Sequence, residues 1–349
     1  MRISLPQADL VRALSAVTRV VEARNTIPIL SNVLLSVADS RMTVKGSDLT
    51  IEASSSVSVL DAVDGAVTVE AKVLADIAKR ASGDVSLVLE DEALVVKFGR
   101  SRFKLKTLPA EDFPDISAGS FEHTFEIDLA SLLSQVEFAQ SSEETRYYLN
   151  GVYFHTYDDH IVVVATDGHR LARFVGPESQ PFDGVILPRK LVSIVPKGKI
   201  KVELSNDRIR LTDNASTITS KLIDGTFPDY RRVVPMENDL KVVVDRDALA
   251  AATDRVAIVQ PDKGKGVRLV ADNDNLKVSY RDDASEDVAA SWDGTEPLEI
   301  GVNGSYLSTA VRVFSSGKVT LEVRDQMSPI RITGQTDGLD MVLMPMRAV

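Results

Sequence analysis

The sequence contains no cysteine, and only four of its 349 residues are histidine. The absence of cysteine excludes disulfides, thiolate metal sites, iron–sulfur clusters and cysteine nucleophiles. No two histidines have the i, i+4 spacing of a helical zinc site. Aromatic residues make up only 5%, with one tryptophan, so we expect an aliphatic core. We see no signal peptide and no run of eighteen apolar residues, which predicts a soluble, cytoplasmic protein without a membrane span.

The motifs that usually identify an enzyme are also missing. The chain lacks a Walker A sequence, a G-x-S-x-G nucleophile elbow and a G-x-G-x-x-G turn after a strand. The sequence therefore predicts no catalytic residues, no metal and no cofactor. A formal net charge of −11 argues against a generally basic nucleic-acid binder, although it leaves room for a local basic surface.

An internal repeat dominates what is present. Two series of segments, each a short strand running into an amphipathic helix, recur along the chain. The helical leucines are spaced 122 and 117 residues apart in the first series and 117 and 116 apart in the second. These leucines are Leu10, Leu132 and Leu249 in the first series and Leu74, Leu191 and Leu307 in the second.

Alternating strand patterns with Asp-Gly, Asp-Asn and Gly-Ser turns lie between the helical segments. They predict an α+β fold of three repeated domains, each built of two β-α-β-β-β halves. An ordinary α+β protein with similar meanders is the competing interpretation. Two Phe-Pro-Asp sequences, at 113–115 and 227–229, precede the polar boundaries. The expected domains are residues 1–118, 119–237 and 238–349.

The chemically richest stretch is Thr166-Asp167-Gly168-His169-Arg170. Asp167 and His169 could bind a metal or share a proton, which would suit a metal-assisted hydrolase. Asp-Gly is first of all a turn signal, however, because glycine adopts positive φ at little steric cost. The flanking segments are strand-like, so a polar turn between two strands is the favoured interpretation.

Two further segments have alternative interpretations. Arg146-Tyr147-Tyr148 could stack on bases or could simply pack in a sheet. The C-terminal Met344-Pro345-Met346-Arg347 offers an adaptable apolar surface for variable peptides, with a final core strand as the alternative.

Five segments taken together resemble the bacterial replicative sliding clamps, the beta subunits of DNA polymerase III. They are IPIL at 27–30, RYYLNG at 146–151, ATDGHRLA at 165–172, SKLIDGTFPDYRRVVP at 220–235 and MPMR at 344–347. The resemblance covers essentially the whole chain. It implies a head-to-tail homodimer whose six domains form a ring around duplex DNA, with helices lining the pore and sheets outside. Such a ring has no enzymatic activity. It tethers the polymerase to DNA without sequence preference and so confers processivity.

The resemblance also implies a cleft for partner peptides between the second and third domains. Its partners would be the polymerase III alpha subunit, the clamp loader and other proteins with a clamp-binding motif. Leu171, Val233, Val342 and Met344 could form an apolar floor. The positions that carry over are Leu149, Thr166, Gly168, His169, Arg170, Leu171, Pro228, Arg232, Val233, Asn303, Tyr306, Val342, Met344, Pro345, Met346 and Arg347.

By the same resemblance, Arg24, Tyr147 and Tyr148 face DNA. The resemblance also puts four apolar residues where two protomers meet, and there three basic residues could pair with acidic Glu286 and Asp287. The positions of this protomer contact are Lys72, Arg100, Arg102, Phe103, Leu105, Ile258, Val259, Glu286 and Asp287. The loops at 196–199 and 261–266 look shorter than is usual in the family.

The charge distribution is compatible with a sliding ring, since strong phosphate contacts would impede sliding. Six predicted helical segments together carry +8, which leaves −19 for the rest of the chain. The segment 129–146 opposes the trend at −2, so we expect an uneven inner wall. A peptide-binding repeat scaffold that does not enclose DNA remains an alternative, as does the hydrolase.

Overall fold

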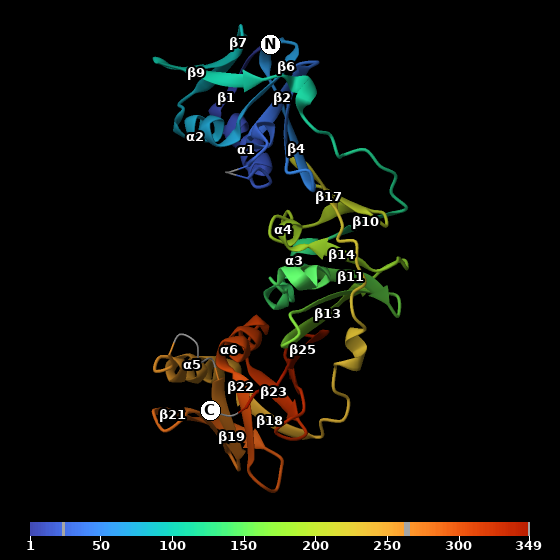
Figure 1. Ribbon diagram of the computed structural model, residues 1–349, viewed down its shortest axis with the longest axis vertical. Coiled ribbons are helices and arrows are strands. Elements are labelled where there is room, and N and C mark those ends of the chain that lie inside the picture. The colour runs from blue at the N-terminus through green and yellow to red at the C-terminus, as the bar shows by residue number, and fades with distance from the viewer. Residues whose placement is uncertain (23–24, 262–265, 348–349) are drawn as a thin grey trace. The chain divides into compact units, whose positions relative to one another are not determined.

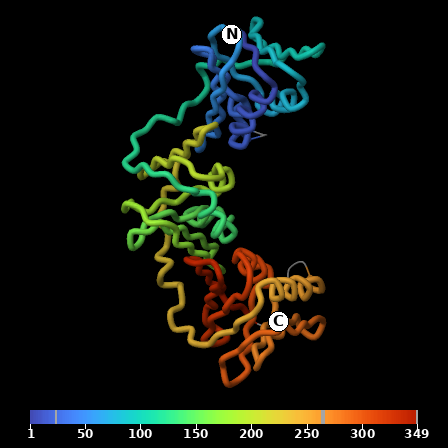
Figure 2. Tube along the Cα trace, turned by 180° about the vertical axis from the view of Figure 1, so that it is seen from behind, coloured from blue at the N-terminus to red at the C-terminus, as the bar shows by residue number. Residues whose placement is uncertain are grey.

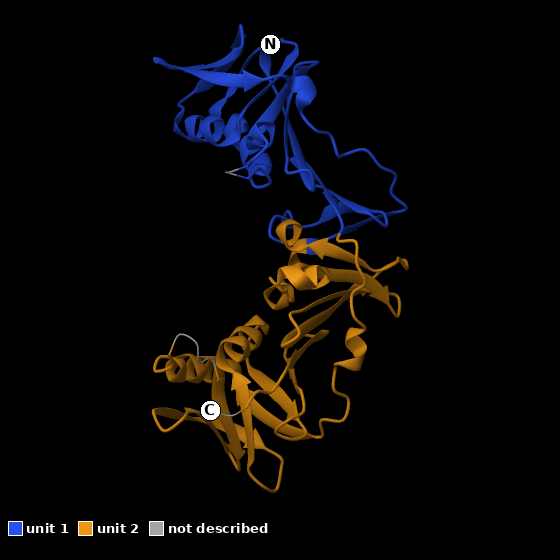
Figure 3. Ribbon diagram, viewed as in Figure 1, with its two compact units in different colours: residues 1–129, 193–222 blue, residues 130–192, 223–349 orange. Residues whose placement is uncertain are grey.

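A computed structural model describes residues 1–22, 25–261 and 266–347. The chain forms two compact units (Figure 3). The first contains residues 1–129 and 193–222, and the second contains residues 130–192 and 223–349. Each unit is built on one antiparallel sheet.

Within the described residues, a strand leads into a helix six times, and three antiparallel strands follow each helix. This order confirms the predicted α+β fold of three domains with twin β-α-β-β-β halves. The extra strand is β5 (Leu60–Val63). The six strand–helix pairs are β1 (Arg2–Pro6) with α1 (Gln7–Thr18), β6 (Gly65–Glu70) with α2 (Ala71–Arg80), β10 (His123–Ile127) with α3 (Leu129–Ser134), β14 (Val185–Pro188) with α4 (Arg189–Val192), β18 (Leu240–Asp245) with α5 (Arg246–Ala257), and β22 (Leu298–Asn303) with α6 (Gly304–Val313).

The sheet of the first unit has the strand order β10-β15-β16-β17-β4-β3-β2-β6-β9-β8-β7-β1-β5. Its members therefore come from both segments of that unit, and β17 pairs with β4 across a long sequence separation. The remaining strands are β2 (Asn32–Ala38), β3 (Arg41–Ser47), β4 (Ile51–Ser58), β7 (Asp84–Glu90), β8 (Ala93–Phe98), β9 (Ser101–Leu108), β15 (Ile200–Leu204), β16 (Arg208–Thr212) and β17 (Ser216–Lys221).

The sheet of the second unit has the strand order β14-β11-β12-β13-β25-β24-β23-β18-β21-β20-β19-β22. The pairing of β13 with β25 joins the second repeat to the end of the third. Residues 223–239 connect the two repeats (Figure 2). These residues form no strand. The remaining strands are β11 (Gly151–Tyr157), β12 (His160–Thr166), β13 (Arg170–Glu178), β19 (Gly266–Asp272), β20 (Asn275–Tyr280), β21 (Ala284–Trp292), β23 (Lys318–Val323), β24 (Ile330–Gly334) and β25 (Leu339–Leu343).

Helices pack in pairs against their sheets, with α1 beside α2 and α5 beside α6 (Figure 1). In α1 the buried residues Leu10, Ala13, Leu14 and Val17 recur every three or four positions and so form one apolar stripe. The helix buries this stripe against β3 and β4. Aliphatic side chains make up most of the core, as the low aromatic content predicts.

The second pair of helices is much shorter than the sequence pattern predicts. Residues 129–146 form only α3, one short 3₁₀ helix and the start of another. Helix α3 does not continue because Val136 leaves the helical region (φ −127°, ψ −17°), and further along the Ser141 hydroxyl accepts a hydrogen bond from Glu143 N (3.1 Å) in a turn. Residues 189–199 form only the four-residue α4, since Pro196 and Gly198 (φ +86°) cannot continue a helix. The 3₁₀ helices are η1 (Pro28–Ser31), η2 (Ala110–Asp112), η3 (Glu137–Ala139), η4 (Glu144–Leu149) and η5 (Tyr230–Arg232).

The predicted charge of the helical segments is corrected accordingly. Helices α1, α3 and α5 are formally neutral, α2 and α4 carry +2 each, and α6 carries +1. The helices remain the positive part of an acidic chain, by a smaller margin than the expected +8. Among the described residues, no helix combines the length and the apolar composition needed to cross a bilayer.

Candidate functional site

The site is organised by the tight turn between β12 and β13. Asp167 Oδ1 accepts hydrogen bonds from the backbone N–H groups of His169 (2.9 Å) and Arg170 (3.0 Å). Thr166 Oγ1 accepts from Gly168 N (3.1 Å) and donates to Arg170 O (2.7 Å). Gly168 has φ +87°, a conformation that favours glycine. The favoured turn interpretation is confirmed, and the Asp167 carboxylate serves to hold the turn.

Strand β25 brings the C-terminal residues to this turn. In the antiparallel pairing with β13, Leu171 lies opposite Val342. Met344 N then donates to His169 O (2.9 Å), and Met346 N donates to Gly301 O (2.8 Å). These bonds hold the MPMR segment against the turn on one side and β22 on the other.

A cavity of about 270 Å³ opens between the turn, β25 and the connecting segment 223–239. Buried Leu149, Leu171 and Val342 form its floor, and exposed Val233 and Met344 form its rim. Its surface is mainly apolar, which suits hydrophobic side chains of a peptide. The lining residues are Leu149, Thr166, Gly168, Arg170, Leu171, Pro228, Tyr230, Val233, Val342 and Met344.

Tyr230 is the lining residue that sequence reasoning missed. Its ring is buried in the cluster that contains Leu149, Leu171 and Val342. Its hydroxyl lies 3.3 Å from Nε2 of the buried His155. Burial raises the pKa of Tyr230 and lowers the pKa of His155, so both groups favour their neutral forms. The sequence signal that could have identified Tyr230 was its position between Pro228 and Arg232, two residues that were predicted to be in the cleft.

Arg170 lines the cavity with a guanidinium that is already engaged within the protein. Its Nε donates to Asp167 Oδ2 (3.1 Å), and its guanidinium lies over the rings of Tyr306 (4.2 Å) and Phe138 (5.2 Å). These contacts within the protein hold the guanidinium in place, so that Arg170 forms a wall of the cavity.

Seven other predicted cleft positions do not line this cavity. Asn303 caps α6 by accepting a hydrogen bond from Tyr306 N (3.2 Å), and the Tyr306 ring lies next to the turn, where it stacks on Arg170. Arg232 is exposed and pairs with Asp229 (3.4 Å) on the connecting segment. These seven positions are His169, Arg232, Asn303, Tyr306, Pro345, Met346 and Arg347.

Of the residues predicted to face DNA, Tyr147 is exposed and Tyr148 is half-buried. Their rings meet edge to face with centroids 5.8 Å apart. Arg24 lies outside the described residues.

Five of the nine residues predicted at the protomer contact lie on two strands with partly open edges: Arg102, Phe103 and Leu105 on β9, and Glu286 and Asp287 on β21. Arg100 directly precedes β9, and Ile258 and Val259 directly follow α5. In the described pairings, β9 meets β6 only at Thr107 and Leu108, and β21 meets β18 only at 290–292. Both strands therefore have backbone positions that lack a second neighbouring strand. Phe103 on β9 is exposed, and its ring stacks on Phe98 at 5.8 Å.

Three of the charged residues predicted at that contact, Arg102, Glu286 and Asp287, already have partners within the chain. Arg102 pairs with Glu90 (2.9 Å), and Glu286 accepts from Arg255 Nε (2.8 Å). The hydrogen bond from Arg255 lowers the pKa of Glu286. Asp287 Oδ1 accepts from Asn275 Nδ2 (2.8 Å). Any pairing across protomers would have to share or replace these exposed, weak interactions.

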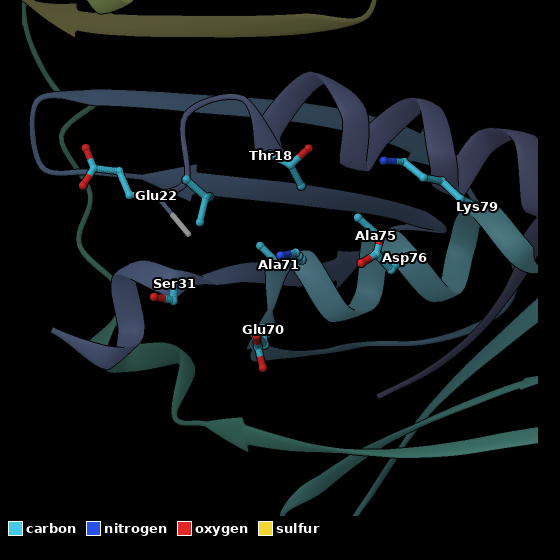
Figure 4. Close-up of a pocket in the computed structure, with 10 residues that line it drawn as sticks. Thr18, Glu22, Ser31, Glu70, Ala71, Ala75, Asp76 and Lys79 are labelled. Carbon is cyan, nitrogen blue, oxygen red and sulfur yellow. The ribbon is translucent and has the colours of Figure 1, made fainter. Parts of the chain in front are cut away.

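Lys72 lines a separate cavity of about 290 Å³ between α1 and α2. Glu22, Glu70, Asp76 and Lys79 lie around the same cavity (Figure 4). Acidic and basic groups are mixed there, so the cavity does not favour an anion over a cation.

Comparison with known proteins identifies the whole chain. Family models for the N-terminal, central and C-terminal domains of the DNA polymerase III beta subunit match residues 1–117, 126–229 and 231–347. The beta sliding clamp of Caulobacter vibrioides is 37% identical, with 99% of this chain and 100% of the relative covered. The Escherichia coli beta sliding clamp is 34% identical with the same coverage.

Solved structures agree with the sequence relatives. The sliding clamp of Bartonella birtlesii, crystallised with griselimycin, has a TM-score of 0.95 at 37% identity and full coverage of both chains. The beta subunit from Pseudomonas aeruginosa has a TM-score of 0.94 at 37% identity, with 99% of this chain and 100% of that chain covered. The chain belongs to the family of beta sliding clamps, the beta subunits of DNA polymerase III, and is a DNA sliding clamp rather than an enzyme.

Proposed function

We propose that two copies of this chain form a head-to-tail ring around duplex DNA and tether the replicative polymerase through the cavity beside Leu171. One observation supports the ring above all: the strand–helix unit recurs six times in the part of the chain that the structure describes. Two units make one domain, so each chain supplies three similar domains, and two chains can close a nearly symmetric ring of six. The proposed domain boundaries remain 1–118, 119–237 and 238–349, and the proposed compartment is the cytoplasm.

Helices on the inside of the ring would face the phosphate backbone. Helices α2, α4 and α6 are positively charged and the other three are neutral, whereas the chain as a whole carries −11. A mildly positive wall attracts DNA without the many tight phosphate contacts that would stop sliding. Exposed Tyr147 is a suitable additional DNA contact, with Tyr148 and Arg24 as further proposed positions.

The open edges of β9 and β21 support a contact between protomers. Pairing these edges would extend the sheet of one chain into that of the next. Residues 101–106 of β9 include Arg102, Lys104 and Lys106, whereas the open part of β21 includes Glu286 and Asp287. This charge complementarity favours β9 of one protomer against β21 of the other. Exposed Phe103 and Ile258, with Val259 and Leu105, would supply apolar area.

The cavity beside Leu171 is the proposed site for partner peptides. It offers a buried apolar floor with an exposed methionine on its rim, and methionine adapts to different partner side chains. We propose that the polymerase alpha subunit, the clamp loader and other proteins with a short, partly hydrophobic motif bind here in turn. Asn303, Tyr306 and Met346 would extend the site beyond the cavity.

The metal-assisted hydrolase is not favoured. Asp167 is occupied by three hydrogen bonds from its own turn. Among the described residues, no group of three or more potential metal ligands is present.

A retention experiment tests the ring. The protein is loaded by its clamp loader onto nicked circular DNA, and half of the sample is then linearised. We expect retention for many minutes on the circle and loss within seconds from the linear DNA, because a topological link ends where the DNA ends. Equal half-lives on both DNAs, with a steep loss as salt rises, would instead indicate an ordinary electrostatic binder.

A further inference from the structure

Two methionine side chains close to the proposed peptide site are almost fully exposed to solvent. Met236 is 82% exposed and Met327 is 77% exposed, whereas Met42 and Met341 are buried in the cores. Large apolar side chains with this degree of exposure, grouped next to a cavity, are typical of an interaction surface. We refer to residues 236–239 and 324–329 as the methionine platform.

The loop that carries Met327 is held rigidly by its own hydrogen bonds. Asp325 Oδ1 accepts from Met327 N (2.8 Å) and Ser328 N (2.7 Å), and Asp325 Oδ2 accepts from Ser328 Oγ (2.9 Å). These bonds lower the pKa of Asp325 and favour its charged form. Met327 is therefore displayed by an ordered turn, which reduces the entropy lost when a partner binds.

A second set of bonds joins the segment that carries Met236 to this loop. Asn238 Nδ2 donates to Glu322 O (2.8 Å) and to Pro329 O (2.8 Å). Arg324 also pairs with Glu237 (3.0 Å). The two methionines thus belong to one surface built from two segments.

The platform is continuous with the peptide cavity. In the pairing of β24 with β25, Ile330 lies opposite Leu343. Continuing this register by one residue puts Pro329 beside Met344, which lines the cavity. On the other side, only two residues of chain separate Met236 from Val233, another lining residue. A peptide chain leaving the cavity can therefore reach both methionines within a few residues.

We propose that the methionine platform binds the residues flanking the cavity-binding motif of the polymerase alpha subunit, through an apolar side chain with basic neighbours. The apolar side chain would pack on Met236 and Met327. The basic preference follows from the charges of the platform, where Glu237, Asp239 and Asp325 outnumber Arg324. This proposal rests on the proposed function of the cavity and extends the site beyond it.

Two peptides from the alpha subunit of the same organism test the proposal. The short one contains the clamp-binding motif alone, and the long one adds ten native residues at each end. Their dissociation constants are measured by fluorescence anisotropy with the wild-type protein and with M236S/M327S. The matched control is L60S/V63S, which removes two exposed apolar side chains from β5 in the other unit.

We expect the long peptide to bind the wild type about tenfold tighter than the short one, the usual size of a contribution from a few apolar contacts. M236S/M327S should lose most of this gain and bind the short peptide normally, while L60S/V63S should keep the gain. The proposal is wrong if the long peptide shows no gain or if M236S/M327S retains it. Failure of the short peptide to bind the wild type would instead overturn the proposed function of the cavity.

Discussion

The protomer contact can be tested by replacing two exposed apolar residues with lysine. Ile258 is 79% exposed and Val259 is 47% exposed in the isolated chain. Complete burial of such a side chain contributes about 1.5–3 kcal/mol. Burial at a contact would then contribute about 2 kcal/mol from Ile258 and about 1 kcal/mol from Val259. Together they correspond to more than a hundredfold in the dissociation constant of each contact.

The lysines of I258K/V259K would add a repulsive term to this loss. Each would enter an apolar contact without a partner, at a cost of several kcal/mol. In the proposed arrangement they would also face Arg102 and Lys104 of β9. Two such contacts close the ring, so the variant should be a monomer at micromolar concentration.

Sedimentation velocity measures this change directly. We expect the wild type to sediment as a dimer and I258K/V259K as a monomer. Both side chains are exposed before assembly, so the substitutions should leave the monomer folded, with a cooperative thermal unfolding transition. The monomer should also still bind the short alpha-subunit peptide. The matched control is L60K/V63K on β5, which is separated from β9 by β8, β7 and β1. A dimeric I258K/V259K, or a monomeric control, would refute the assignment of the contact.

Three other predictions follow from the peptide site and its surroundings. M344A/M346A should weaken the alpha-subunit peptide by about 2 kcal/mol without changing the dimer, and an unchanged calorimetric affinity would contradict the site. Burial lowers the pKa of His155, so below about pH 6.5 the unfolded chain binds a proton at this residue more readily than the folded chain does. The unfolding free energy should therefore fall as the pH drops from 7 to 5. Urea titrations should show a flatter pH dependence for H155N, and an equal slope would exclude His155 as the cause. G168A should cost about 1 kcal/mol of stability and weaken peptide binding, because φ is +87° and a Cβ would lie 2.8 Å from Arg146 Nη1. G198A, with φ +86° and no atom within 4 Å, should lower stability alone, and equal peptide affinities for the two variants would refute a role for the Gly168 turn.

Much of the fold was predictable because its signals are local. The apolar stripe of α1 and the Asp-Gly turn between β12 and β13 depend on neighbouring residues and standard geometry. The repeat spacing added long-range information, since corresponding residues of repeated domains are expected to occupy corresponding positions in the fold. The predicted lengths of α3 and α4 were wrong, because the backbone leaves helical conformation at Val136 and a Pro-Lys-Gly sequence at 196–198 cannot continue a helix.

The sequence by itself determined the α+β class, the threefold repeat, the acidic character of the chain and most residues of the candidate cavity. Only the tertiary structure decided how those residues are used. Arg170 pairs with Asp167 and stacks on Tyr306, and Tyr230 becomes a wall because its hydroxyl meets His155. Such roles depend on which side chains meet after β25 pairs with β13, a contact between residues about 170 positions apart. No local sequence pattern specifies that pairing, because the pairing of distant strands is selected by the packing of the complete sheet.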